Sequence, residues 1–226
     1  KGKMPILVGT GTINPDAVKS NTLQALDLGC DASLLVTPYY VKPPQRCLVK
    51  HMLDAADNWG LPVVIYNVPG RTGVNMLDEN IAMCAQHENI VGLKDATGDL
   101  SRLENMKNLI TMSGSGSNSN DDNDGEFLLY SGDDGTSLDF LKRGGHGCIS
   151  VTANLAAQQM HDICVAVRQG RLDDREIKLN IADAQRWKRL LHGAILGAAL
   201  GAVNLKAAPL DRVFDFALHV FVCFNA

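Results

Sequence analysis

Six short apolar runs, rich in branched aliphatic residues, recur along the chain with amphipathic stretches between them. Continuous apolar runs are typical of strands buried on both faces, and parallel sheets bury both faces. The runs span residues 5–9, 33–37, 62–66, 90–94, 127–131 and 148–152, and the amphipathic stretches include 16–28, 48–58, 77–87, 100–109 and 155–169. Strands and helices in such regular alternation predict right-handed βαβ units.

Two architectures contain such units, a closed (β/α)₈ barrel and an open doubly wound sheet. The open sheet favours a glycine-rich phosphate loop after its first strand, and the sequence contains no G-x-G-x-x-G. Polar residues instead follow the C-terminal ends of several strands, which is where barrel enzymes assemble their sites. We therefore expect an α/β protein that forms an incomplete TIM (β/α)₈ barrel, with about six βα units visible, followed by C-terminal helices.

The order of segments predicts two regions. Residues 1–170 are expected to form the partial barrel, interrupted at residues 113–124 by a low-complexity insertion too polar to bury anything. Residues 171–226 are expected to form a C-terminal helical region that diverges after about residue 192. The chain opens with Lys1 in place of an initiator Met and enters a strand at once, so we expect an N-terminal truncation. An eight-unit barrel needs two more βα units than the six that are visible.

Charge and cysteine content argue against several classes of protein. The net charge of −4 includes no concentrated basic face, so we expect no nucleic-acid partner. The most apolar run, residues 194–203, is too short to span a membrane. The six cysteines lie far apart without a C-x-x-C pair, which favours core-filling thiols in a reducing compartment over disulfides or a zinc site. We therefore expect a soluble intracellular protein.

Three residues at predicted strand ends or in the loops after them could perform chemistry. Lys94 ends a strand, where burial would disfavour the ammonium form and leave the neutral amine that attacks a ketone. Tyr66 can both donate and accept a proton, and Arg71 has the fork geometry that holds carboxylates. Taken singly, each position is explained as well or better by an ordinary role: a rim lysine paired with Asp95, a packed rim tyrosine and a surface arginine.

A metal site is the alternative suggested by Asp133 and Asp134. Neighbouring carboxylates without a histidine at ligand spacing are more often a polar turn or a helix N-cap. The six histidines are scattered along the chain and are interpreted as structural. We therefore expect no metal site.

Five motifs at separate strand ends, taken together, reverse the ordinary interpretation of Lys94 and Tyr66. They are Val36-Thr-Pro-Tyr-Tyr, Tyr66-Asn-Val-Pro-Gly-Arg-Thr-Gly, Gly92-Leu-Lys-Asp-Ala-Thr-Gly-Asp, Ser131-Gly-Asp-Asp and Gly144-Gly-His-Gly-Cys-Ile-Ser-Val-Thr-Ala-Asn. In order and spacing they resemble the signature of the dihydrodipicolinate synthase family, over roughly residues 5–191 outside the insertion. Two departures from the family are the absence of its first two βα units, with their Thr-Thr-Gly-Glu segment, and the absence of its Asn-Pro-x-Pro-x-Lys stretch.

The resemblance implies a lyase of the class I aldolase type, in which Lys94 forms a Schiff base with pyruvate. Tyr66 would transfer protons during imine formation and cyclisation. Tyr40 would cross a dimer interface and join a proton relay in the neighbouring subunit. Because product release regenerates the amine, no metal or organic cofactor is needed, and the family predicts a homo-oligomer, a dimer or tetramer, when full length.

The remaining implied roles concern substrate binding. Arg71 would contact the carboxylate of the aldehyde substrate, and Ile149 and Gly132 would line the pocket. Arginine at position 71 favours condensation of pyruvate with L-aspartate-4-semialdehyde to give 4-hydroxy-tetrahydrodipicolinate. That reaction is the first committed step of lysine (diaminopimelate) biosynthesis, in the cytoplasm or, in an alga or plant, in the plastid stroma. The alternatives are a sister aldolase or lyase acting on N-acetylneuraminate or keto-deoxy sugars, and a truncated barrel without activity that serves as a binding or regulatory subunit.

Overall fold

The computed structural model describes residues 4–112, 126–171 and 221–224. The chain divides into two compact units, Lys1–Cys148 and Ile149–Ala226. The predicted insertion at 113–124 lies outside the described residues, as does most of the predicted C-terminal region 171–226. The domain boundary that we placed at residue 170 stays a prediction.

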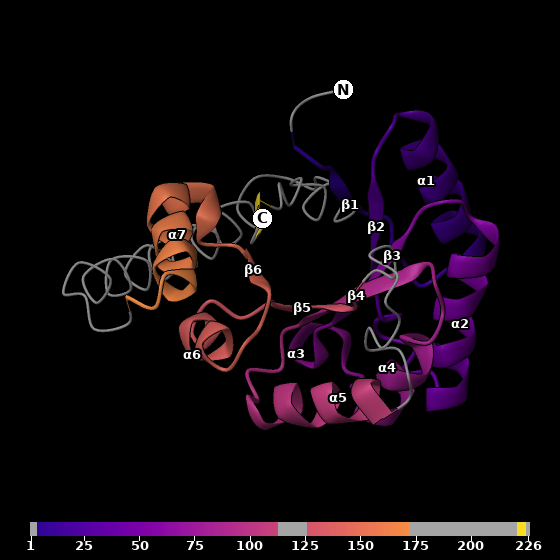
Figure 1. Ribbon diagram of the computed structural model, residues 1–226. Helices are drawn as coiled ribbons and strands as arrows, with labels where there is room; N and C mark the ends of the chain where they lie inside the picture. Colours follow the sequence, from indigo (N-terminus) through magenta and orange to yellow (C-terminus); the bar gives the residue numbers. More distant parts are fainter. Residues whose placement is uncertain (1–3, 113–125, 172–220, 225–226) are drawn as a thin grey trace, which may run out of the picture. The chain divides into compact units, whose positions relative to one another are not determined.

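Strands and helices alternate along the first unit (Figure 1). Its strands are β1 (Leu7–Gly9), β2 (Ala32–Val36), β3 (Val63–Asn67), β4 (Ile90–Asp95) and β5 (Leu128–Ser131), and its helices are α1 (Pro15–Asp27), α2 (Gln45–Asn58), α3 (Pro69–Thr72), α4 (Asp78–Cys84), α5 (Ser101–Met112) and α6 (Ser137–Lys142). The strand β6 (Gly147–Ser150) begins in this unit and ends in the second, which also contains α7 (Ala153–Arg168) and β7 (Phe221–Phe224). All six predicted strands are present. The additions to the predicted pattern are the short helices α3 and α6 and the strand β7, which lies in the region predicted to be helical.

The strands β1 to β6 pair in chain order, and every pairing is parallel. Helices α1, α2, α4 and α5 line one side of the strands of the first unit (Figure 1). Sequential parallel strands joined by helices are the repeating unit of a (β/α)₈ barrel. The predicted partial barrel is therefore confirmed for these six strands.

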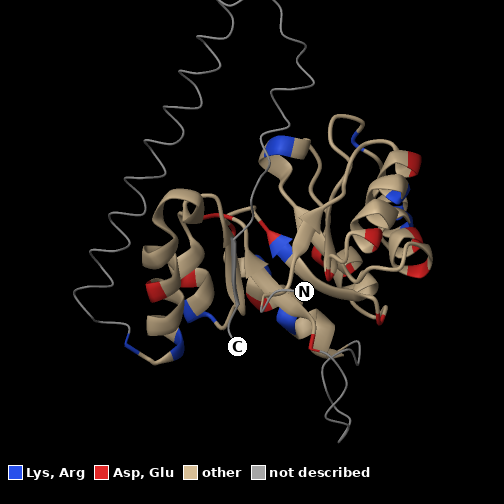
Figure 2. Cartoon of the chain, turned by 90° about the horizontal axis from the view of Figure 1, so that it is seen from above, with Lys and Arg blue, Asp and Glu red and all other residues tan. Residues whose placement is uncertain are grey.

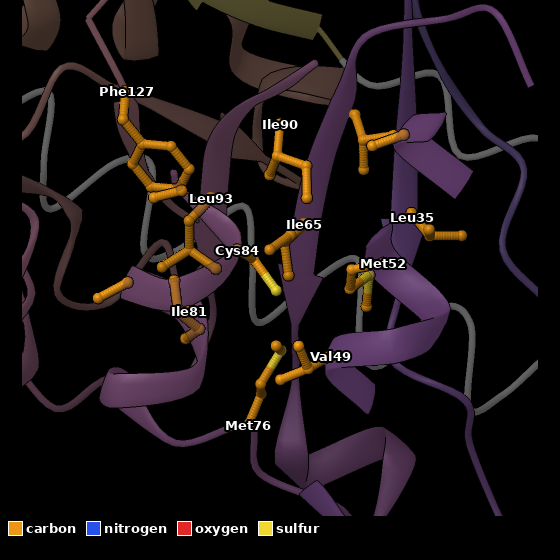
Figure 3. Packing of buried hydrophobic residues seen from close by; sticks show 14 of the residues in the cluster. Leu35, Val49, Met52, Ile65, Met76, Ile81, Cys84, Ile90, Leu93 and Phe127 are labelled. Carbon is orange, nitrogen blue, oxygen red and sulfur yellow. The ribbon is translucent and has the colours of Figure 1, made fainter. Parts of the chain in front are cut away.

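The main apolar core fills the layer between the strands and these helices. Leu35, Ile65 and Leu93 are aligned on neighbouring strands, and each is completely buried in this layer (Figure 3). From the helices, Met52 of α2 and Ile81 of α4 pack against the same cluster. Since side chains alternate along a strand, the residue that follows each of Leu35, Ile65 and Leu93 points to the opposite face of the sheet. That opposite face holds the candidate site.

Five cysteines are free thiols: Cys30, Cys47, Cys84, Cys148 and Cys164. Cys84, Cys148 and Cys164 are buried, as expected of core-filling thiols, whereas Cys47 is exposed on α2. Among the described helices, none is long and apolar enough to cross a lipid bilayer.

Candidate active site

Two charged residues lie within the described strands β1–β6, and they are the neighbours Lys94 and Asp95 of β4. The other Lys, Arg, Asp and Glu residues of the described chain lie on helices and connecting segments (Figure 2). Lys94 is 1% exposed and Asp95 is 6% exposed. Charged side chains are almost never buried to this degree unless they are paired or functional. The C-terminal end of β4 is thus the first place to look for chemistry.

The amine of Lys94 lies over the ring of Tyr66, with its nitrogen 4.1 Å from the ring centroid. The two residues are aligned on the neighbouring strands β3 and β4, so their side chains share one face of the sheet. Burial lowers the pKa of Lys94 from 10.5 to about 8, an effect that outweighs the opposing negative charge of Asp134. At pH 7 roughly a tenth of this amine is therefore neutral and nucleophilic, far more than for a lysine with the ordinary pKa.

The phenol of Tyr66 keeps its proton near neutral pH. Burial raises its pKa above the ordinary value of 10, although the nearby positive charge of Arg71 acts in the opposite direction. A protonated phenol beside an amine can donate a hydrogen bond and pass a proton. An amine that can act as a nucleophile thus lies over the ring of a residue that can carry a proton.

Arg71 lies in the one-turn helix α3, directly after β3. The helix ends at Gly73, which has φ of 72°, a left-handed conformation that glycine adopts without strain. The Arg71 side chain is exposed, yet its charge lowers the pKa of both Lys94 and Tyr66. The structure thus brings Lys94, Tyr66 and Arg71 together.

Gly132 approaches the Lys94 side chain closely. A Cβ atom added at position 132 would lie 2.9 Å from Lys94 Cε and 3.0 Å from Lys94 Cγ, and 2.9 Å from the Cβ of Ala96. Real Cβ atoms essentially never show contacts below 3.0 Å. The glycine therefore leaves the space through which the lysine stem passes.

Two other predicted site residues have different surroundings. Tyr40 is 86% exposed and has φ of 68°, which is uncommon for a residue other than glycine. Its side chain is therefore not part of the buried arrangement around Lys94. Ile149 belongs to the second unit and is 1% exposed.

The polar turn predicted at Asp133 is confirmed. Its carboxylate accepts hydrogen bonds from the backbone N–H and the hydroxyl of Thr136, both at 3.0 Å, immediately before α6. Among the described residues, no group of three or more His, Cys, Asp or Glu side chains is arranged to hold a metal ion.

Two residues near the amine were missed at the level of sequence. Asp134 was considered only as a metal ligand or turn residue, but its charge acts on Lys94. Tyr130 is aligned with Lys94 on β5 and is 4% exposed, and burial raises its pKa. Parallel pairing counted outward from Lys94 would have identified Tyr130, because it occupies the matching position of the next strand.

A family model described as the dihydrodipicolinate synthetase family matches residues 1–187. The 4-hydroxy-tetrahydrodipicolinate synthase of Alcanivorax borkumensis is 43% identical over 173 residues, covering 76% of this chain and 54% of that relative. That of Teredinibacter turnerae is 38% identical over 227 residues, covering 96% of this chain and 74% of the relative. The chain thus spans about half the length of the first relative.

Two solved structures of dihydrodipicolinate synthases have a fold similar to that of this chain. The dihydrodipicolinate synthase of Acinetobacter baumannii, crystallised with pyruvate, matches with a TM-score of 0.73 and 34% identity, covering 94% of this chain and 72% of that one. The enzyme of Aquifex aeolicus matches with a TM-score of 0.72 and 29% identity, covering 84% and 60% respectively.

Proposed function

The chain belongs to the dihydrodipicolinate synthetase family, and on that basis we propose that its protein condenses pyruvate with L-aspartate-4-semialdehyde to give 4-hydroxy-tetrahydrodipicolinate. The proposed reaction proceeds through a Schiff base on Lys94, as in a class I aldolase-type lyase, and would begin the diaminopimelate route to lysine. The observation that most strongly supports it is the buried amine of Lys94, whose pKa is lowered to about 8 and which lies 4.1 Å from the ring of Tyr66.

Lys94 acts as the nucleophile in this proposal. Its neutral nitrogen adds to the ketone carbon of pyruvate, and the resulting carbinolamine loses water to give the imine. Loss of a proton from the pyruvyl methyl group gives an enamine, whose carbon attacks the aldehyde of the second substrate. Release of the product returns the free amine, so the cycle needs neither a metal nor an organic cofactor.

Tyr66 is proposed to supply and accept the protons that these steps require. Its raised pKa supports this role, because the phenol then starts each cycle protonated. Tyr40 is proposed to extend the proton relay from a neighbouring subunit. The 86% exposure of Tyr40 supports that proposal, since an exposed aromatic side chain in a strained backbone conformation is available to a partner.

Substrate binding is assigned to Arg71, Gly132 and Ile149. Arg71 would hold the carboxylate of the aldehyde substrate, for which a guanidinium at the rim of the site is suited. Its electrostatic effect on both Lys94 and Tyr66 supports a position close to the reacting groups. Gly132 and Ile149 would line the pyruvate pocket.

A homo-oligomer, a dimer or tetramer, follows from the proposed role of Tyr40. We assign the protein to the cytoplasm, which is supported by its five free thiols between Cys30 and Cys164 and by the bacterial origin of the relatives.

The reaction is tested by incubating the protein with pyruvate and L-aspartate-4-semialdehyde and following the loss of both. Equal consumption of the two substrates is expected. Cleavage of N-acetylneuraminate at a comparable rate would assign the protein to a sister activity instead, and no turnover of either mixture would favour an inactive barrel.

A further inference from the structure

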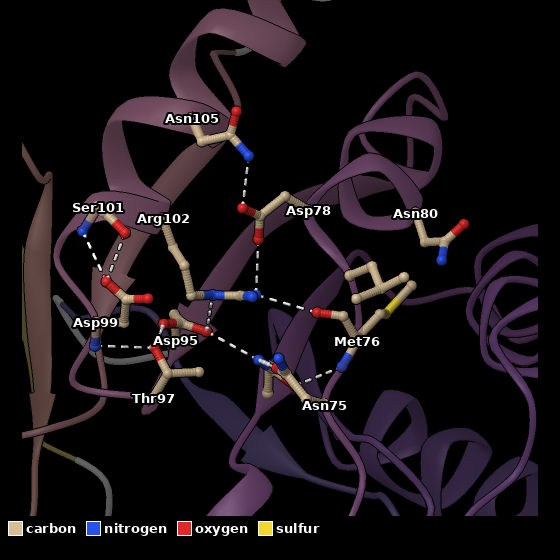
Figure 4. Close-up of polar contacts among 12 residues, drawn as sticks. Asn75, Met76, Asp78, Asn80, Asp95, Thr97, Asp99, Ser101, Arg102 and Asn105 are labelled. Carbon is tan, nitrogen blue, oxygen red and sulfur yellow. Dashed lines mark hydrogen bonds and ion pairs between the residues drawn. The ribbon is translucent and has the colours of Figure 1, made fainter.

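A buried polar network surrounds Asp95 and Arg102 (Figure 4). Because side chains alternate along a strand, Asp95 points to the face of the sheet opposite to that of its neighbour Lys94. The centre of the network is Asp95, whose Oδ1 accepts a hydrogen bond of 2.9 Å from Asn67 Nδ2 and lies 3.7 Å from Arg102 Nε. Thr97 donates its hydroxyl hydrogen to the other oxygen, Oδ2. The Arg102 and Asp95 side chains are 11% and 5% exposed. The carboxylate is thus buried together with a cation and two neutral donors.

Arg102, near the start of α5, joins this network to two further segments. Its Nη2 atom lies 2.9 Å from Oδ1 of Asp78, at the start of α4, and donates a hydrogen bond of 3.0 Å to the carbonyl oxygen of Met76. Met76 N–H in turn donates to Asn67 Oδ1 at 3.0 Å. One guanidinium therefore ties α5, α4 and the ends of β3 and β4 into a closed circuit.

The circuit lies directly behind the reacting pair. Asn67 follows Tyr66 on β3, Asp95 follows Lys94 on β4, and both pairs are aligned across the two strands. Side chains alternate along a strand, so the two contacts lie on opposite faces of the sheet. The Asn67–Asp95 hydrogen bond joins β3 and β4 one residue after the position where Tyr66 and Lys94 meet on the other face. A change in the position of either strand end would alter the distance between amine and phenol.

We propose that Arg102 is a positioning residue for the amine site: through Asp95 and Asn67 it fixes the relative position of the β3 and β4 ends, and hence of Tyr66 and Lys94. The inference rests on the proposed function, because it assigns Arg102 a role in imine formation at Lys94. Displacement of a reacting group by about 1 Å can cost on the order of 10²-fold in rate. A buried guanidinium with two ion pairs, to Asp78 and Asp95, and one hydrogen bond, to the carbonyl oxygen of Met76, can hold these segments in place.

The alternative is that Arg102 only fastens α5 to the sheet. The titration of the Lys94 amine separates the two ideas. Burial is the largest cause of its lowered pKa, and the groups that act on it electrostatically are Asp134, Arg71 and Cys148. If the strand ends loosen, water reaches the amine and its pKa returns toward 10.5. A purely structural loss would lower the melting temperature and leave the pH midpoint of imine formation unchanged.

The test measures the rate at which pyruvate and borohydride modify Lys94, as a function of pH, in the parent and in Arg102→Met, Arg102→Lys and a control. The control is Arg143→Met. Arg143 forms an ion pair of 3.1 Å with Glu104, which lies on α5 like Arg102, but this pair is at the surface. We expect a midpoint near pH 8 for the parent and for the control. For Arg102→Met we expect a midpoint at least about one pH unit higher, which lowers the rate at neutral pH about tenfold. Arg102→Lys should lie between them.

Should Arg102→Met fail to fold, Asp95→Asn decides the question. It keeps the shape of the side chain and weakens its hold on Arg102. Asp95 is not among the groups that act electrostatically on Lys94, so a higher midpoint in this variant would come from a change in the positions of the strand ends. If a folded variant keeps the pH midpoint and the rate of the parent, the inference about Arg102 is wrong and the proposed function is unaffected. A parent that forms no adduct on Lys94 would overturn the proposed function and the inference together.

Discussion

Gly132 of the segment after β5 and Lys94 of β4 are packed so closely that a single methyl group at position 132 would collide with the lysine stem at Cγ and Cε. This close approach requires a glycine at position 132 because a larger side chain would have no space there, and not because of the backbone conformation. It also makes position 132 a sensitive test of the site.

Gly132→Ala should displace the Lys94 side chain, since the added Cβ meets both Lys94 and Ala96. We expect a destabilisation of about 1–3 kcal/mol, typical of overpacking, and a slower pyruvate adduct on Lys94. Denaturant unfolding and borohydride trapping measure the two effects. Gly9→Ala is the matched control, because a Cβ there meets nothing within 4 Å. Equal behaviour of the two variants would contradict the packing described here.

The lowered pKa of Lys94 has a consequence for stability. Between pH values of about 8 and 10.5 the unfolded chain binds one proton more than the folded chain at this residue, so stability rises with pH through that window. Below it, the buried ammonium costs roughly 3 kcal/mol. Lys94→Met should therefore raise the free energy of unfolding at neutral pH, and the gain should shrink by about that amount toward pH 10.5. A gain that does not change with pH would contradict the lowered pKa.

Tyr66→Phe keeps the ring beneath the Lys94 nitrogen and removes the proton that Tyr66 can transfer. Loss of a general acid or base typically costs about 10²–10⁴-fold in rate. We expect a loss of this size in turnover with little change in melting temperature. The control is Tyr39→Phe, at a more exposed tyrosine. Turnover within a few-fold of the parent would remove Tyr66 from the mechanism.

The fold was predictable because the strands of a parallel barrel are buried on both faces and therefore appear in the sequence as continuous apolar runs. The helix α6, six residues long, is too short for a periodic pattern to reveal it. The polar network was not predictable either. Arg102 and Asp95 are separated by a loop, and their pairing with Asp78 depends on how α4 and α5 pack on the sheet. The sequence pattern thus locates strand ends but does not say which distant polar groups meet behind them.

Arg71→Ala should raise the KM for L-aspartate-4-semialdehyde much more than the KM for pyruvate, because only the aldehyde loses the partner of its carboxylate. The same change removes a positive charge that lowers the pKa of Lys94 and Tyr66, so the pH profile should also move to higher pH. Steady-state kinetics over a range of pH values measure both effects. Arg46→Ala, at another exposed arginine, is the control. An equal rise in both KM values would contradict the assignment of Arg71 to the aldehyde.

The central claim is that Lys94 forms the Schiff base, and borohydride reduction in the presence of pyruvate tests it most directly. Mass spectrometry of the digested protein should find one reduced pyruvyl group, on the peptide that contains Lys94. Lys94→Arg should abolish both the adduct and turnover, because arginine stays charged and forms no imine. An unmodified Lys94 after treatment, or turnover of Lys94→Arg within about tenfold of the parent, a barrier change of only about 1.4 kcal/mol, would contradict the account.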